Sequence, residues 1–139
     1  PRVSRLAASL LAAVLLAGCV QRGYHVRRGG GTPLKGRYVE EGLASWYGLS
    51  SKGRVFEHGG PTASGVPYDM NAMTAAHKTL PLGTRVKVTN LDNGRTILVV
   101  VNDRGPYIEG RIIDLTLRGA RALGFKDEGT ARVRIEAYQ

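Results

Sequence analysis

Short segments in which apolar and polar residues alternate run through the second half of this 139-residue chain. Residues 85–89 read Arg-Val-Lys-Val-Thr, the pattern of a half-buried strand. Asn93-Gly94 follows as a strong signal for a tight hairpin turn, and residues 96–101 form a β-branched run suited to a central strand. These features predict a β-hairpin at the centre of a mainly β fold.

The remaining pattern extends this fold. Further strands are expected at residues 43–47, 111–115 and 131–138. The one convincing helix covers residues 116–124, with Thr116 as the expected N-cap and Gly124 as the expected end. Many short strands and one helix within about 95 residues favour a small closed barrel, which would leave no strand edge exposed.

The N-terminal part of the chain has a different composition. Arg2 and Arg5 precede an apolar run at residues 6–18, which is too short to span a bilayer and has the layout of a secretory signal peptide. Residues 20–41 include three consecutive glycines and few large apolar side chains, as is typical of a flexible tether. The predicted organisation is a signal peptide at 1–18, a tether at 19–41 and one domain at 42–139.

Cys19 is the one cysteine of the chain and closes the tetrapeptide Leu16-Ala17-Gly18-Cys19. This tetrapeptide resembles the lipobox of bacterial lipoproteins, which implies that Cys19 is lipidated and anchors the protein to a membrane. A single cysteine cannot form an internal disulfide, so the lipidated assignment also explains its presence in an exported protein. The alternative is a cysteine that lies in a signal peptide by chance.

The charge of the chain restricts its partners only in part. A formal net charge of +9 favours anionic partners such as cell-wall polymers or lipid headgroups. We expect no nucleic acid, because no nucleic-acid motif or series of stacking aromatic residues accompanies the charge. Glu57 and His58 suggest a metal pair, but no second cluster with ligand spacing accompanies them, so neither a metal nor another cofactor is expected.

Five blocks, in order, resemble the rare lipoprotein A family: residues 42–48, 62–65, 72–83, 101–106 and 111–115. The resemblance implies a six-stranded double-psi β-barrel related to expansin and endoglucanase domains. It also implies the activity of an endolytic lytic transglycosylase that acts on peptidoglycan glycan strands stripped of their stem peptides. Such an enzyme cleaves the bond between N-acetylmuramic acid and N-acetylglucosamine and leaves a 1,6-anhydro product.

The resemblance assigns the catalytic positions residue by residue. His77 and Asp103 match the functional histidine and aspartate of the family, whereas Val66 occupies the position of its catalytic glutamate. A valine cannot donate a proton to a glycosidic oxygen, and general acid catalysis contributes about 10²–10⁴-fold in rate. Three interpretations therefore stay open. They are a transglycosylase that relies on Asp103 with help from Glu57 or His77, a non-catalytic expansin-like glycan-binding module, and a degenerate or misread sequence.

Other residues are candidates for substrate binding, each with a structural alternative. Trp46 and Tyr47 are suited to stacking on sugar rings or to filling the core. His77 is equally suited to a packed structural role, and Asp103 to a turn in which Arg104 pairs with it. The remaining candidates near the substrate are Thr62, Tyr68, Asp69, Arg104 and Asp114. Asp114 is also expected to satisfy a buried backbone group or to pair with Arg104 or Arg111.

The resemblance extends to location and partners. It implies a monomeric cell-envelope lipoprotein with septal proteins among its partners. Val20 follows Cys19 in place of the aspartate that retains lipoproteins at the inner membrane, so the expected location is the outer membrane, facing the periplasm.

Overall fold

The computed structural model describes residues 36–48 and 61–137. The predicted signal peptide, Cys19, Glu57 and His58 lie outside these residues, as does most of the predicted tether. The described elements, in chain order, are β1 (Tyr38–Trp46), β2 (Thr74–His77), β3 (Arg85–Asn90), β4 (Thr96–Asp103), β5 (Arg111–Leu115), α1 (Leu117–Leu123) and β6 (Thr130–Ala137).

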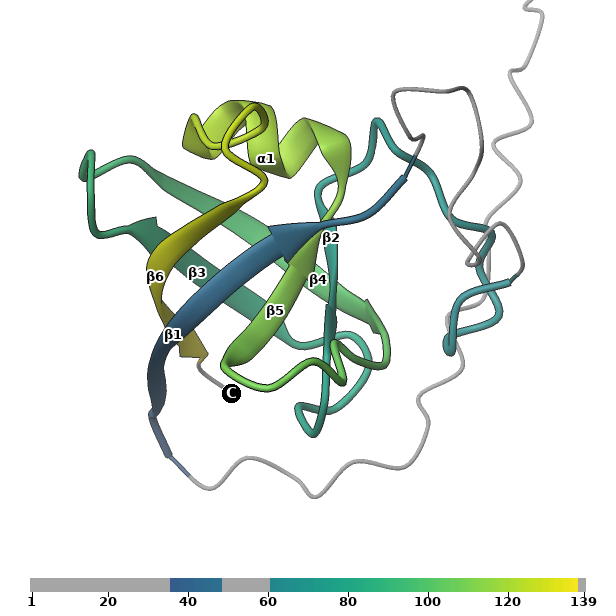
Figure 1. Cartoon of the computed structure of the whole chain (residues 1–139). Helices are drawn as coiled ribbons and strands as arrows, with labels where there is room; N and C mark the ends of the chain where they lie inside the picture. The colour runs from purple at the N-terminus through teal and green to yellow at the C-terminus, as the bar shows by residue number, and fades with distance from the viewer. Residues whose placement is uncertain (1–35, 49–60, 138–139) are drawn as a thin grey trace, which may run out of the picture.

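The six strands form one closed barrel. Their order around it is β1-β5-β2-β4-β3-β6, and β6 pairs back onto β1 (Figure 1). The pairs β1·β5 and β2·β4 are parallel, and the other four pairs are antiparallel. The architecture is therefore the mainly β, six-stranded barrel with one short helix that the sequence predicts.

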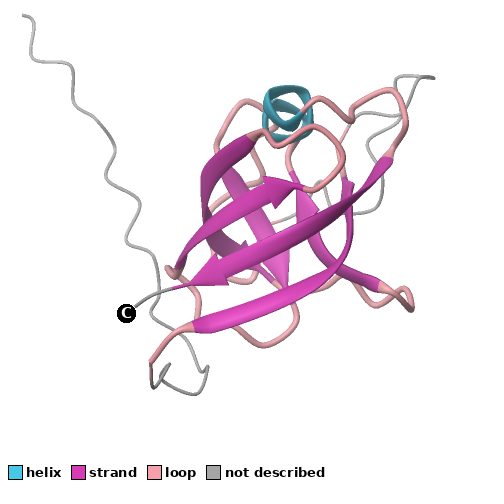
Figure 2. Cartoon of the chain, turned by 90° about the vertical axis from the view of Figure 1, so that its left-hand side faces the viewer, coloured by secondary structure: helices cyan, strands magenta, loops and turns pink. Residues whose placement is uncertain are grey.

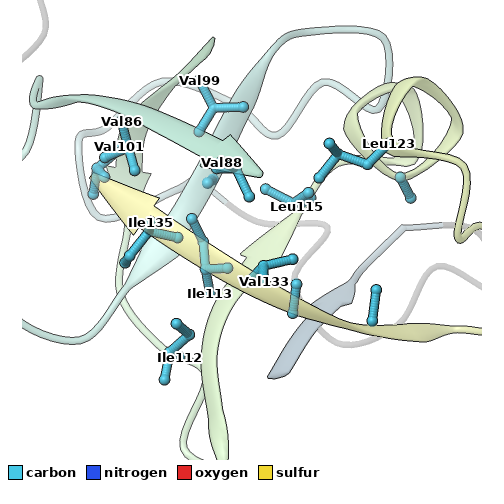
Figure 3. Packing of buried hydrophobic residues seen from close by; sticks show 14 of the residues in the cluster. Val86, Val88, Val99, Val101, Ile112, Ile113, Leu115, Leu123, Val133 and Ile135 are labelled. Carbon is cyan, nitrogen blue, oxygen red and sulfur yellow. The ribbon is translucent and has the colours of Figure 1, made fainter. Parts of the chain in front are cut away.

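Valine and isoleucine side chains fill the interior of the barrel. β3 alternates between exposed and buried residues, and its Val86 and Val88 are fully buried opposite Val99 and Ile97 of β4. Ile113, Val133 and Ile135 meet them from β5 and β6 (Figure 3). Burial of this apolar surface is the main stabilising contribution, at roughly 25 cal/mol per Å² removed from water.

Helix α1 covers one end of the barrel (Figure 2). Thr116 caps it, as predicted, because its side-chain oxygen accepts the amide hydrogen of Gly119, and Gly124 ends it in the left-handed conformation at φ 78°. Leu117, Ala120 and Leu123 face the barrel and are buried. α1 has seven residues, and no helix within the described ranges is long and apolar enough to cross a membrane.

The predicted turn between β3 and β4 also holds the end of this helix. Gly94 has a φ of 74°, as a tight turn at Asn93-Gly94 requires. The side-chain amides of Asn90 and Asn93 both donate to the carbonyl of Leu123, at 3.0 and 2.8 Å. Two asparagines of one turn therefore satisfy a carbonyl that the helix itself leaves unpaired.

Two strands differ from the sequence-based expectation. β1 begins at Tyr38, although the tether was expected to continue to Glu41, because residues 38–45 pair with β6 from Ala137 back to Thr130. β2 was not expected at all. It is only four residues long, is built around two alanines and is covered on both sides, so it shows neither alternation nor β-branched residues.

Candidate functional site

An irregularity in the β2·β4 pair creates the candidate site. Ala75 is paired with Val101, but Ala76 is paired with Asp103, so Asn102 is an extra residue in β4. Such a β-bulge breaks the alternation of side chains and turns the extra residue in a new direction. Val101 is fully buried in the core, while Asn102 lines a pocket on the outside of the barrel.

A tight turn at residues 62–66 lies over the end of β4. Thr62 closes the turn, because its backbone amide and its hydroxyl both donate to the carbonyl of Val66, at 3.0 and 2.5 Å. The amide of Ser64 donates to the carbonyl of Asn102 at 3.0 Å, which fixes the turn to the bulge. The side chain of Thr62 is buried, and its role in the structure is to hold this turn.

The pocket lies between the segment after this turn and strands β2 and β4. It has a volume of about 260 Å³ and is lined by Val66, Pro67, Tyr68, Asp69, Ala72, Thr74 and Asn102. Val66, Tyr68 and Asp69 were expected near the substrate. Asn102 and Thr74 were not, because neither has a charge or a ring that marks it in the sequence. The available signal for Asn102 was a polar residue that interrupts the β-branched run of β4 just before Asp103.

Asp103 lies beside the pocket at the end of β4 and is partly exposed. Its Oδ1 accepts two backbone amides, from Ala63 and from Arg104, each at 2.9 Å. Among the described residues, Oδ2 has no hydrogen-bond partner, so it is the oxygen that can meet a ligand. The carboxylate is thus oriented by the turn at 62–66 and by its own loop.

The ring of His77 is held by groups other than Asp103. Its ring is 2 % exposed, and Nδ1 accepts the amides of Thr79 and Leu80 at 3.1 and 3.0 Å. Nε2 lies 3.3 Å from Oε2 of Glu40, and the ring of Tyr38 packs edge-on at 5.8 Å. Burial lowers the pKa of His77, although Glu40 opposes this shift. Both ring nitrogens are therefore occupied within the fold, which corresponds to the structural role considered for this residue.

The other candidates have partners that define their positions. Trp46 donates to the carbonyl of Lys126 at 3.1 Å and packs against the core. Arg104 donates to the carbonyls of Leu80 and His77, at 2.6 and 3.3 Å, so it braces the turn after β2. Asp114 accepts the hydroxyl of Ser45.

Tyr47 and Tyr68 pack against each other at the pocket. The rings of Tyr47 and Tyr68 lie 4.6 Å apart, and the hydroxyl of Tyr68 donates to the carbonyl of Tyr47. Burial raises the pKa of Tyr68 to about 12 and raises that of the deeper Tyr47 further. Tyr47 is almost completely buried, so only Tyr68 of the pair lines the pocket. No group of three or more metal-ligating side chains occurs in residues 36–48 and 61–137.

Comparison with solved structures identifies the class of barrel. The Streptomyces papain inhibitor matches with a TM-score of 0.54 at 24% identity, over 73% of this chain and 96% of the inhibitor. A mutant expansin of Clavibacter michiganensis, solved in complex with cellohexaose, matches with a TM-score of 0.54 at 23% identity, over 73% of this chain and 51% of the expansin. The fold is a double-psi β-barrel.

Sequence comparison then gives the family. Residues 39–135 match the lytic transglycolase family model, and the chain belongs to this family. The endolytic peptidoglycan transglycosylase RlpA of Pseudomonas aeruginosa is 54% identical over 99 residues, which are 71% of this chain and 27% of that protein. RlpA of Vibrio cholerae is also 54% identical, over 71% of this chain and 35% of its own length. The chain thus spans about a third of the curated relatives it matches.

Proposed function

We propose that this domain binds peptidoglycan glycan strands in the pocket at the end of β4 and holds them without cleaving them. The observation that carries the proposal is the position of Val66, whose side chain lines the pocket. The family resemblance places a catalytic carboxyl group at this position, and here the pocket wall is apolar. The pocket is present, and the position that the resemblance assigns to the catalytic acid has no group that can protonate the leaving oxygen.

The other polar residues of the pocket are poor substitutes for that acid. Tyr68 has a pKa raised to about 12, and its hydroxyl already donates to the carbonyl of Tyr47. Thr74 and Asn102 have no ionisable group. Asp69 is exposed, and its Oδ1 accepts the amide of Asn71 at 2.8 Å in a local turn, which suits it to binding sugar hydroxyls. The pocket thus combines an aromatic ring, a carboxylate, a hydroxyl and an amide with an apolar wall. These are features of a sugar-binding pocket.

Product analysis tests the proposal directly. The protein would be incubated with amidase-treated sacculi, co-sedimented to measure binding, and its soluble products examined by mass spectrometry. We expect the native protein to sediment with the sacculi and to release no 1,6-anhydro sugars. Val66→Glu should release them, because it returns a carboxyl group to the pocket. Failure of the native protein to sediment with the sacculi would refute the binding proposal.

A second candidate function is cleavage by Asp103 alone. Its support is the Oδ2 atom, which has no hydrogen-bond partner among the described residues and belongs to a partly exposed side chain. The same mass spectra decide this alternative. If the native protein releases anhydro sugars and Asp103→Asn does not, Asp103 is the acid. Asp92→Asn is the matched control, because it removes an exposed carboxylate that does not line the pocket.

Cys19 supplies the membrane anchor in this proposal. We infer from the lipobox resemblance that Cys19 is lipidated and holds the domain at the outer membrane, within reach of the glycan and of septal proteins. Metabolic labelling with a radioactive fatty acid should label the native protein and not Cys19→Ser. Labelling of Cys19→Ser to the same extent would contradict the assignment.

A further inference from the structure

The carboxamide of Asn102 is the most unusual polar group near the pocket. Asn102 is 7 % exposed, and its Oδ1 is buried with no hydrogen-bond partner among the described residues. Buried amide oxygens in folded proteins nearly always have a hydrogen-bond partner. Burial removes the water that would otherwise bond to them, so an unpaired oxygen is energetically unfavourable. A group of this kind beside a pocket is therefore a candidate for pairing with a ligand.

The bulge explains why Asn102 is available. As the extra residue of β4, it has no direct partner in β2, and its backbone carbonyl is already bonded to Ser64. Its side chain lines the pocket, and its oxygen has no hydrogen-bond partner among the described residues. Rotation about the last side-chain bond exchanges the amide oxygen and nitrogen with little change of shape, so the residue can present either an acceptor or a donor to the pocket.

The other walls indicate what this amide would meet. Val66, Pro67 and Ala72 supply an apolar surface close to the carboxamide. A ligand group that matches both the carboxamide and the apolar surface must contain an amide bonded to a small apolar group. An acetamido group has this composition: its N–H and C=O complement the carboxamide, and its methyl group fits against the apolar residues.

We propose that the pocket recognises the acetamido substituent of an N-acetylated amino sugar, with Asn102 hydrogen-bonded to its amide and Val66 packed against its methyl group. The inference rests on the proposed glycan-binding function and adds the chemical feature of the glycan that is read. The inference also assigns Val66 a function in ligand binding, because a valine contacts a methyl group more favourably than a charged side chain does.

Two neutral oligosaccharides test this recognition. Tetra-N-acetylchitotetraose and cellotetraose share a β-1,4-linked backbone and differ in the substituent at carbon 2, acetamido in the first and hydroxyl in the second. Titration of the whole chain, kept in mild detergent because of the apolar run at residues 6–18, would be followed by NMR. We expect the N-acetylated tetramer to bind about tenfold more tightly, as one additional hydrogen bond in a site of this kind permits.

Variants assign the preference to the residue. Asn102→Leu keeps the branching of the side chain at Cγ and removes its polar atoms, so the preference should fall to less than about threefold. Asn71→Leu is the matched control, since it changes an exposed asparagine that does not line the pocket, and it should keep the preference. A second measurement uses the native protein and therefore does not depend on whether a variant folds. The side-chain amide NMR signals of Asn102 should shift when the N-acetylated tetramer is added and should not shift when cellotetraose is added.

The outcomes separate this inference from the function on which it rests. Equal binding of both tetramers, unchanged Asn102 side-chain signals, or a preference that survives Asn102→Leu would overturn acetamido recognition by this residue. If the protein still sediments with denuded sacculi, glycan binding stands without it. If sedimentation is lost as well, the proposed function itself is wrong.

Discussion

At the scale of single residues, the environment of His77 links the stability of the barrel to pH. Its ring is buried, Nδ1 accepts two amides, and Nε2 faces Glu40. Burial lowers the pKa of His77 below 6.5, with Arg104 and Lys78 contributing in the same direction and Glu40 opposing them. In the unfolded chain the histidine takes up a proton more readily than in the folded barrel, so acid favours unfolding.

We therefore predict that the free energy of unfolding is highest above pH 6.5 and falls as the pH decreases through that value toward the lower folded pKa of His77. Urea denaturation at a series of pH values measures this dependence. His77→Asn should flatten it, because an amide oxygen can still accept the amides of Thr79 and Leu80 but does not titrate. His58→Asn is the control and should keep the slope. A native protein whose stability is constant between pH 7 and 5 would contradict the prediction.

At the scale of elements, Thr116 connects the helix to the pocket. Its hydroxyl accepts the amide of Gly119 at 3.2 Å and donates to the carbonyl of Ala72 at 2.6 Å, and the residue is fully buried. Ala72 lines the pocket. One hydroxyl thus caps α1 and fixes the segment that precedes β2.

Thr116→Val removes both hydrogen bonds and keeps the shape of the side chain. We expect a loss of about 2 kcal/mol in the free energy of unfolding, from the missing cap and the buried carbonyl left without a donor. Thr116→Ser keeps the hydroxyl and should cost clearly less. Urea denaturation of the three proteins measures the difference. Equal losses for valine and serine would show that the methyl group, and not the hydroxyl, matters here.

The accuracy of the sequence-based predictions also varies by element. β3, β4, β5 and α1 were predicted to within two residues, because alternation, the Asn93-Gly94 turn and the caps are local signals. The sequence of β2 has no local pattern typical of a strand, because the burial of its alanines results from the elements that pack on both sides of them.

The candidate site, too, could be predicted only in part from the sequence. The resemblance placed Val66, Tyr68 and Asp69 near the substrate, and the structure gathers all three at one pocket. Asn102 could not be found in this way, because its place in the pocket wall arises from a pairing irregularity between two strands that are distant in sequence.

At the scale of the whole molecule, the first and last strands are neighbours. Tyr38 is paired with Ala137, and β1 and β6 run antiparallel along eight paired positions. The loop between α1 and β6 contains the exposed residues Asp127 and Glu128, neither of which lines the pocket. Joining the ends and opening this loop would convert β6 and β1 into a local hairpin.

We predict that a circular permutant that begins at Glu128, joins residue 137 to residue 36 through a short glycine-rich linker and ends at Asp127 folds to the same barrel. Every strand pair is retained, and exposed loops tolerate new ends. Thermal unfolding should remain cooperative, and amide NMR signals of residues 61–77 should be close to those of the unpermuted domain. Opening the chain within β4, between Val99 and Val100, is the control and should prevent folding.

The closure between β1 and β6 also affects when the barrel can form during synthesis. Arg37 and Glu136, which form an ion pair across this seam, are 99 positions apart in the chain. A polypeptide is made from its N-terminus, so β1 is available long before the strand that completes the sheet beside it. Contacts between such distant residues also slow folding, because a large loop must close first. The barrel is therefore expected to form late, only after residues 130–137 have left the ribosome, and to remain until then an open chain that a translocation channel or a chaperone can still engage.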